Sequence, residues 1–295
     1  MEDKKAVSEF INEDYARHAR VWVVVASHKK YEMPNDKMYI PLHVGAAVQD
    51  KNKAMEMSDF QRDDTGENIS ERNPQFCELT GLYWAWKNLS ADYIGLVHYR
   101  RHFKGRKKTE GNAGFERVLT YSELKPIIET HSVIVPKKRH YYIETLEQHY
   151  AHNHHEEELN TARDILFEKY PEYKNAYNTA MKRTWGYMFN MMILRKDLLD
   201  EYSEWLFDIL FKLADELNVN EKNAAIMTPF EKRFPGRVSE RLFNVWLQYQ
   251  IETGNIKKKD IYEFPFEYME HINIFKKGFT FIMAKFFNKK PKKSC

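Results

Sequence analysis

A short apolar run near the start of the chain constrains the fold most strongly. Val21 to Ala26, with the sequence VWVVVA, is continuous and mostly β-branched. Because it does not alternate with polar residues, it predicts a strand buried on both faces, as in a parallel sheet. Further apolar runs lie at 39–47, 93–97, 131–136 and 187–194, with helical patterns between them. We therefore predict an α/β fold with a mainly parallel central sheet flanked by helices.

The stretch from Asn68 to Phe103 combines a predicted helix with a predicted strand. Asn73 suits a helix cap and Pro74 suits the first helical turn, so we expect a helix from there to about Asn88. The strand at 93–97 follows, and a glycine inside it, Gly95, indicates close approach of another backbone or a ligand. Glu78 and Thr80 are polar positions within the helical apolar pattern and are candidate ligand contacts.

Five polar side chains follow this strand directly: His98, Tyr99, Arg100, Arg101 and His102. In open α/β sheets, ligands bind outside the carboxyl ends of the strands. Two guanidinium groups beside two imidazoles and a phenol at such a strand end predict an anion-binding site, because arginine bonds phosphate in a bidentate manner.

Two other segments carry weaker signals for binding. His28 and Lys29 follow the first strand, so they are either ligand contacts at the same sheet edge or part of a solvated loop. The acidic loop that contains Asp63, Asp64 and Asn68 does not have the spacing of a calcium loop. It either holds a divalent cation or is capped by its own Asp and Asn side chains.

Three further candidates lie in the second half of the chain. The His-rich stretch around His154 lacks the HExxH order of zinc enzymes, so we expect a single histidine, His154, to contact a ligand. Asn190 is embedded in the apolar run 187–194, where it needs a hydrogen-bond partner or a ligand. Glu240, followed by Arg241, lies in the first turn of a helix predicted to begin near Val238, either as a favourable charge at the helix dipole or as a catalytic carboxylate.

Bulk composition narrows the class of protein. The 295 residues carry a net charge of +3, which is too small to indicate nucleic-acid binding. Cys77 and Cys295 provide neither a disulfide framework nor metal-ligand spacing, which favours a reducing compartment. The first 20 residues show no signal peptide, and no apolar run reaches the ~18 residues that span a bilayer. We therefore expect a cytoplasmic protein.

The last part of the chain differs from the rest. From Phe264 onward, aromatic and aliphatic residues alternate with lysines, and no acidic residue occurs from Lys276 to Lys293. Such a segment is typical of a helix that lies in an anionic membrane interface, although a helix docked on the core with a solvated lysine tail has the same pattern. We predict a lead-in at 1–19, one domain at 20–263, and a helical extension at 264–295 that contacts the inner face of the cytoplasmic membrane.

Several strings of the sequence, in their order, resemble a known bacterial family. They are VVVASHK, IPLHVGAA, ELTGLYWAWKN, GLVHYRR and SERLFNVWL, and the resemblance covers roughly residues 20–250. The family, first described as a domain of unknown function, contains glycosyltransferases of capsular and exopolysaccharide synthesis. The resemblance implies a GT-A-like fold and a nucleotide-sugar donor, with UDP-linked galactose or galactofuranose as the first expectation.

The resemblance also implies roles for particular residues. GT-A enzymes carry Asp-x-Asp after the donor-site strand to hold a metal on the diphosphate, whereas this chain has His98-Tyr99-Arg100 there. Metal dependence therefore stays open, and Arg100 and Arg101 are expected to neutralise the diphosphate in place of a cation. By analogy with GT-A enzymes, Glu240 is the expected base in an inverting displacement. Its rivals are Asp92, Asp64 and Glu78.

The expected acceptor is a polyprenyl-linked saccharide of capsule, O-antigen or exopolysaccharide synthesis. Two alternatives stay open at this stage. One is a non-catalytic protein that binds sugars or polyanions in a polysaccharide assembly system, and the other is a sugar-phosphate transferase. Candidate contacts to donor or acceptor are Glu78, Thr80, Asp92, His154, Asn190 and Arg241.

Overall fold

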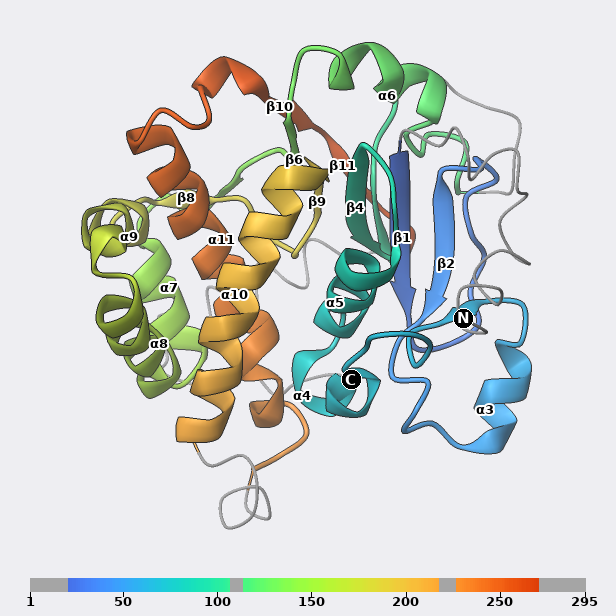
Figure 1. Cartoon of the computed structure of the whole chain (residues 1–295), viewed down its shortest axis with the longest axis horizontal. Coiled ribbons are helices and arrows are strands. Elements are labelled where there is room, and N and C mark those ends of the chain that lie inside the picture. The colour runs from blue at the N-terminus through green and yellow to red at the C-terminus, as the bar shows by residue number, and fades with distance from the viewer. Residues whose placement is uncertain (1–20, 107–113, 218–226, 271–295) are drawn as a thin grey trace.

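One mixed sheet forms the centre of the computed structural model, which describes residues 21–106, 114–217 and 227–270 (Figure 1). The main strand order is β10-β6-β9-β4-β1-β2-β3. The strands are β1 (Val21–Ser27), β2 (Tyr39–His43), β3 (Gln61–Arg62), β4 (Tyr93–His98), β6 (Val133–Pro136), β9 (Met192–Arg195) and β10 (Ile261–Phe264). Four neighbouring pairs are parallel, and β9 runs antiparallel to both β4 and β6. The predicted α/β class with a mainly parallel sheet is confirmed.

The β1 strand is buried along its whole length, as its sequence predicts. It lies between β2 and β4, with helix α5 (Leu79–Asn88) packed against it. Gly95 of β4 meets a neighbouring backbone, because a Cβ atom there would lie 2.8 Å from the carbonyl oxygen of Met192 in β9. Gly95 therefore allows the backbone of β9 to approach β4 closely, which is the role that a glycine inside a strand indicates.

A short hairpin extends the sheet beyond β4. The chain turns at Tyr99 and Arg100 into β5 (Arg101–Phe103), and β5 pairs with β11 (Phe266–Tyr268). The sheet therefore continues past residue 263, where we predicted the main domain to end. The predicted lead-in at 1–19 and the tail from residue 271 onward, including its helical and membrane-contact predictions, lie outside the described residues.

Helices cover the sheet and build a second layer beside it. Helix α5 and the long α10 (Lys196–Glu216) pack near β4, while α11 (Phe234–Glu252) lies between α10 and the group α7, α8 and α9 (Figure 1). The remaining bounds are α3 (Lys51–Glu56), α4 (Asn73–Phe76), α6 (Tyr121–Ile128), α7 (Leu146–Asn153), α8 (Glu156–Lys169) and α9 (Lys174–Met181). None of the helices within the described ranges is long and apolar enough to cross a membrane.

Three predicted element boundaries are wrong, each for a local backbone reason. The helix that opens at Asn73 is interrupted at Cys77, which has a φ of 51°, and resumes at Leu79. The strand predicted over 187–194 begins only at Met192, because Phe189 and Asn190 also have positive φ. Helix α11 starts at Phe234, with a proline in its first turn, and this places Glu240 in the second turn.

Candidate functional site

Polar side chains converge at the carboxyl ends of β4 and β6. Because β9 is antiparallel to both strands, the residues that precede it, Phe189 and Asn190, lie at the same edge of the sheet. Both have left-handed backbone conformations, with φ of 80° and 51°. Non-glycine residues rarely adopt this region, and such strain is concentrated at functional sites. This turn is the centre of the candidate site.

Phe189 connects positive charge with a carboxylate. The guanidinium carbon of Arg101 lies 4.3 Å from the centroid of the Phe189 ring, and that of Arg139 lies 5.9 Å away. The backbone N–H of Phe189 donates to Oε1 of Glu240 at 2.9 Å. One turn therefore brings Arg101 of the HYRR motif and the predicted base Glu240 into one site.

Asn190 fixes this turn to two helices. Its Nδ2 donates to Oε1 of Glu78 at 2.8 Å and to the carbonyl oxygen of Gly236 at 3.0 Å. Its Oδ1 accepts from the Ser239 hydroxyl at 2.8 Å. Of the two alternatives for this residue, the structure shows internal hydrogen bonds that satisfy the amide and join the start of α5 to α11.

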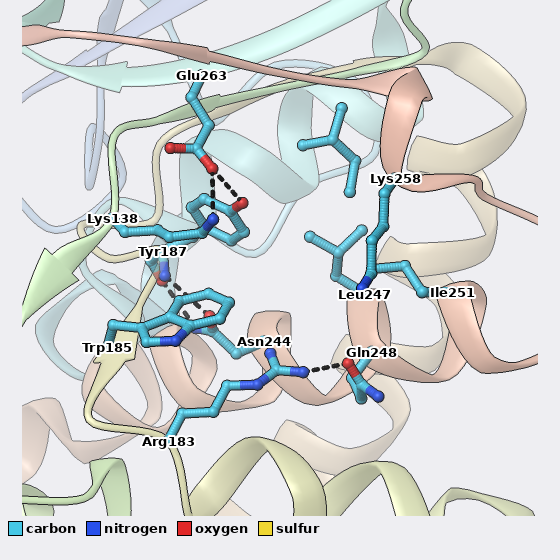
Figure 2. Close-up of a pocket in the computed structure, with 11 residues that line it drawn as sticks. Lys138, Arg183, Trp185, Tyr187, Asn244, Leu247, Gln248, Ile251, Lys258 and Glu263 are labelled. Carbon is cyan, nitrogen blue, oxygen red and sulfur yellow. Dashed lines mark hydrogen bonds and ion pairs between the residues drawn. The ribbon is translucent and has the colours of Figure 1, made fainter.

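A second amide holds the chain on the other side of the turn. Asn244, one helical turn after Glu240, accepts from the backbone N–H of Tyr187 and donates to the Tyr187 carbonyl, both at 2.8 Å (Figure 2). Its Nδ2 also donates to the backbone carbonyl of Glu240. The segment 187–190 is thus anchored to α11 at both ends, which makes the strained conformation rigid.

Two carboxylates, Glu78 and Glu240, flank the turn in different environments. Oε2 of Glu240 accepts from Arg241 at 3.0 Å, and Arg241 in turn packs over the Tyr150 ring at 5.2 Å. Burial raises the pKa of Glu78, and the nearby charge of Glu240 acts in the same direction. Burial of one carboxylate beside a second one is a common arrangement at sites of proton transfer.

Positive charge at the site exceeds what the acids neutralise. Within the described part of the chain, neither Arg101 nor Arg139 forms an ion pair, and the Nε of Arg101 is buried without a hydrogen-bond partner. A buried donor without a partner is costly, which favours an external acceptor. An anion with several oxygen atoms, such as a diphosphate, matches these two guanidinium groups.

The remaining residues of the HYRRH motif divide into different environments. Arg100 is exposed and lies 3.7 Å from Glu270, while Lys29 lies 3.8 Å from the same carboxylate. Each of these two cations lies 5.2 Å from the centroid of the Tyr99 ring, and His28 packs edge-on against this ring at 5.4 Å. The ends of β1 and β4 therefore do come together, as the sequence predicts.

The two imidazoles of the motif, His98 and His102, carry no positive charge near neutral pH. Burial, together with the neighbouring arginines, lowers the pKa of His98 to about 2. Burial lowers the pKa of His102 to about 3, and this ring is fully buried against Tyr39 and Phe115. Both side chains are neutral near pH 7, so the positive charge of the motif is that of Arg100 and Arg101.

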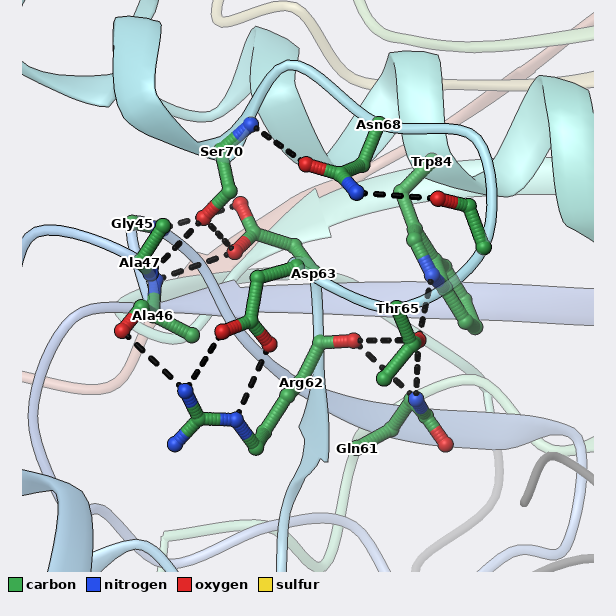
Figure 3. A network of polar contacts seen from close by, with 12 residues as sticks. Gly45, Ala46, Ala47, Gln61, Arg62, Asp63, Thr65, Asn68, Ser70 and Trp84 are labelled. Carbon is green, nitrogen blue, oxygen red and sulfur yellow. Dashed lines mark hydrogen bonds and ion pairs between the residues drawn. The ribbon is translucent and has the colours of Figure 1, made fainter. Parts of the chain in front are cut away.

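Asp63 belongs to a separate, internally satisfied network (Figure 3). Its carboxylate is fully buried and accepts from the backbone N–H groups of Gly45 and Ala46, and from the hydroxyls of Ser70 and Thr80. This is the capped loop that we considered beside a cation site. In the described ranges, no group of three His, Cys, Asp or Glu side chains is placed to hold a metal ion.

Four other candidates lie away from the Phe189 turn. Asp64 pairs with Arg62, and Asn68 bonds within its own loop. Asp92 precedes β4 and therefore lies at the opposite edge of the sheet, where its carbonyl accepts from the backbone of Lys196. His154 packs between the rings of Tyr150 and Phe230. Of the three rival bases, the structure brings only Glu78 beside Glu240.

Sequence reasoning missed Arg139, Phe189 and Tyr268. Arg139 follows the 131–136 strand in a basic run, so the rule that led to His98 and Arg101 could have found it. Phe189 looked like an ordinary strand residue. Tyr268, whose ring lies 5.2 Å from the Arg101 guanidinium, was assigned to the predicted C-terminal segment, but β11 places it beside β5.

Comparison with known proteins bears on the fold and the family of this chain. No curated protein sequence matches the chain. A solved apo structure of WbbM, a bifunctional glycosyltransferase, is similar, with 32% sequence identity and a TM-score of 0.74. The similarity covers 85% of this chain but 45% of the WbbM chain, so this chain spans less than half of that protein. A family model matches residues 22–251, and the chain therefore belongs to the DUF4422 family, described as a domain of unknown function.

Proposed function

We propose that this chain is a glycosyltransferase that transfers a sugar from a nucleotide-sugar donor, with a UDP-sugar as the first choice. The observation that carries the proposal is the pair of guanidinium groups, Arg101 and Arg139, beside Glu240 at the carboxyl edge of the sheet. The similarity to a glycosyltransferase structure, with 32% identity over 85% of this chain, supports the same reading.

In this proposal the donor lies across the carboxyl ends of β1 and β4. Arg101 and Arg139 bind its diphosphate, and Arg100 contributes less because Glu270 already neutralises part of its charge. Lys29, His28 and Tyr99 surround the rest of the nucleotide. Fixed guanidinium groups stabilise the negative charge that develops on the leaving diphosphate. Galactose and galactofuranose remain the first sugars to test.

Transfer then needs one base. A hydroxyl of the acceptor attacks the anomeric carbon, the bond from this carbon to the diphosphate oxygen breaks, and the nucleoside diphosphate leaves with the electron pair. Glu240 takes the hydroxyl proton, since its carboxylate is already oriented by the Phe189 N–H and Arg241. Glu78 is the alternative base, and a single displacement inverts the anomeric centre.

We further propose a polyprenyl-linked saccharide as the acceptor. The lysine-rich segment beyond Glu270 would hold the enzyme on the anionic inner face of the cytoplasmic membrane. Removing residues 271–295 is expected to reduce binding to liposomes that contain anionic lipid, measured by co-sedimentation. Equal binding of the full and the shortened chain would contradict this role for the segment.

A donor panel tests the proposed activity. The full chain is incubated with UDP-, GDP-, CMP- and dTDP-sugars, with and without manganese, and both thermal stabilisation and the released nucleotide are measured. Stabilisation by one donor class and release of the nucleoside diphosphate support a glycosyltransferase. Release of UMP would indicate a sugar-phosphate transferase, and stabilisation without turnover on any acceptor would indicate a binding protein. Dependence on manganese answers the open question about a cation.

A further inference from the structure

A cavity of about 430 Å³ lies on the other face of the ribbon that carries Arg139. The ribbon consists of β7 (Arg139–His140) and β8 (Trp185–Gly186), which pair antiparallel with Arg139 opposite Gly186. Side chains alternate across a strand, so Arg139 points to the Phe189 turn, whereas Lys138 and Trp185 line the cavity. The cavity is therefore separate from the site described above.

Positive charge predominates among the residues that line this cavity. Lys138 and Arg183 lie over the Trp185 ring, at 4.6 and 4.7 Å from its centroid, and Lys258 lies on the opposite wall (Figure 2). Glu263 is the one acid in the lining, and its carboxylate is bound by Lys138 at 2.9 Å. Within the described residues, neither Arg183 nor Lys258 forms an ion pair, although the Glu252 carboxylate is near enough to Arg183 to act on its charge. The residues that line the cavity therefore carry a net positive charge.

The state of Glu263 also fits a cavity that accepts an anion. The Tyr187 hydroxyl donates to Glu263 at 2.7 Å. Burial by itself would raise the pKa of Glu263, but the hydrogen bonds from Lys138 and Tyr187 hold this pKa below its ordinary value. The acid is thus fully engaged by its neighbours, and the charge that remains for a ligand is positive.

The other walls suit the faces and hydroxyls of a sugar ring. Leu247, Ile251 and Ile261 provide aliphatic surface, and Gln248, which accepts a hydrogen bond from Arg183, provides an amide. Cations already lie over the Trp185 ring, which leaves less room for a stacked nucleobase. The volume falls within the range of about 300–1,000 Å³ that is usual for small-molecule sites.

Helix α11 connects this cavity with the candidate active site. Glu240 lies at the Phe189 turn, while Asn244, Gln248 and Ile251 follow along the same stripe of the helix and line the cavity. Eight residues of α-helix, from Glu240 to Gln248, span about 12 Å. The segment 187–189 crosses α11 between the two, because Phe189 bonds Glu240 and Tyr187 bonds Asn244, so a saccharide that joined the two sites would pass around this segment.

We propose that the cavity between the β7–β8 ribbon and α11 binds an acidic sugar, one that carries a carboxylate or a phosphate. Its use as a subsite for an acidic saccharide acceptor rests on the proposed function, but the binding itself does not. A carboxylate and a phosphate would be bound by the same cations, and the probes below distinguish the two groups.

Direct binding tests this proposal without any turnover. Glucuronic acid, glucose 6-phosphate, inorganic phosphate and neutral glucose are titrated into the full chain and followed by calorimetry. We expect one acidic sugar to bind at least tenfold more tightly than glucose and than inorganic phosphate, and the preferred probe identifies the acidic group. Equal binding of acidic and neutral sugars, or binding of inorganic phosphate as tight as that of the preferred acidic sugar, would overturn the proposal.

A matched pair of lysines locates the binding. Lys258→Gln removes a cavity cation, while Lys259→Gln changes an exposed lysine of the same short helix that does not line the cavity. We expect Lys258→Gln to weaken binding about three- to tenfold, as for the loss of one ordinary hydrogen bond, and Lys259→Gln to leave binding unchanged. Equal effects of the two variants would contradict the location. Glu240→Gln should leave binding of the acidic sugar unchanged, because Glu240 does not line the cavity. Binding in the cavity is thereby tested independently of the proposed transfer activity.

Discussion

Two buried polar networks in this molecule, around Asp63 and around the Phe189 turn, differ in how completely they are satisfied. The Asp63 carboxylate receives two backbone N–H groups and two hydroxyls, and these contacts close a loop onto α5. At the Phe189 turn, two carboxylates share the edge of the sheet with Arg101 and Arg139, which form no ion pair among the described residues. A network that satisfies itself stabilises the fold, whereas one with unused donors is prepared for a ligand.

Backbone conformation separates the two networks as well. The Asp63 loop uses glycines, Gly45 and Gly66, at its positive φ angles. The second network places Phe189 and Asn190 at positive φ without glycine. Strain of this kind costs of order 1–3 kcal/mol for each residue and persists where the surroundings enforce it. Here the hydrogen bonds of Asn190 and Asn244 hold the strained conformation in place. The strain indicates that the position of the Phe189 N–H and ring serves function at the expense of local stability.

The largest expected effect comes from Glu240→Gln. Loss of the base should lower kcat about 10²- to 10⁴-fold while donor affinity is retained. Steady-state kinetics and donor titration measure the two quantities. Glu204→Gln, an exposed acid on α10, is the matched control and should leave both unchanged. If Glu240→Gln retained full activity and Glu78→Gln lost it, Glu78 would be the base.

The second largest effect is expected on the stability of the protein, when the Asp63 network is broken. Asp63→Ala leaves four buried donors without their acceptor and should lower the free energy of unfolding by about 2–4 kcal/mol. Chemical denaturation measures this loss. Asp59→Ala, which removes an exposed ion pair with Lys30, should cost under about 1 kcal/mol. A small loss for Asp63→Ala, together with loss of a bound metal, would instead support a cation site.

A smaller effect is expected for donor binding. Arg101→Gln should weaken the affinity for a nucleoside diphosphate about tenfold, which corresponds to ~1.4 kcal/mol, because one bidentate contact is lost. Arg100→Gln should have less effect, since Glu270 already pairs with Arg100. Equal losses for the two variants would show that both arginines of the motif contact the diphosphate, as the sequence alone suggests.

The smallest effect is a change in how stability depends on pH. The pKa of Glu78 is raised in the folded state, mainly by burial, so this residue holds its proton at a higher pH when folded than when unfolded. Stability should therefore fall as pH rises from the ordinary glutamate pKa through the raised value. Glu78→Gln should remove this part of the decline, measured as melting temperature against pH. An unchanged profile would mean that Glu78 is solvated.

Much of the fold follows from the sequence, and the site follows only in part. The β-branched run at β1 and the glycine in β4 predict a buried sheet and a close neighbour, because these signals reside in single strands. The turn at Phe189 and Asn190 could not be predicted, since its conformation is imposed by Asn244, Ser239 and Glu78 from distant elements. The same is true of the neutral imidazoles, because burial of His98 and His102 is a property of the tertiary structure.

Titration of UDP into the wild-type chain and into the double variant Arg101→Gln, Arg139→Gln tests the central claim most directly. The claim is that these two arginines, joined by the Phe189 ring, bind the diphosphate of the donor. We expect measurable binding to the wild type and a loss of at least about tenfold in the double variant, with the fold retained by circular dichroism. Equal affinity of the two proteins, or no binding of UDP to the wild type, would contradict the claim.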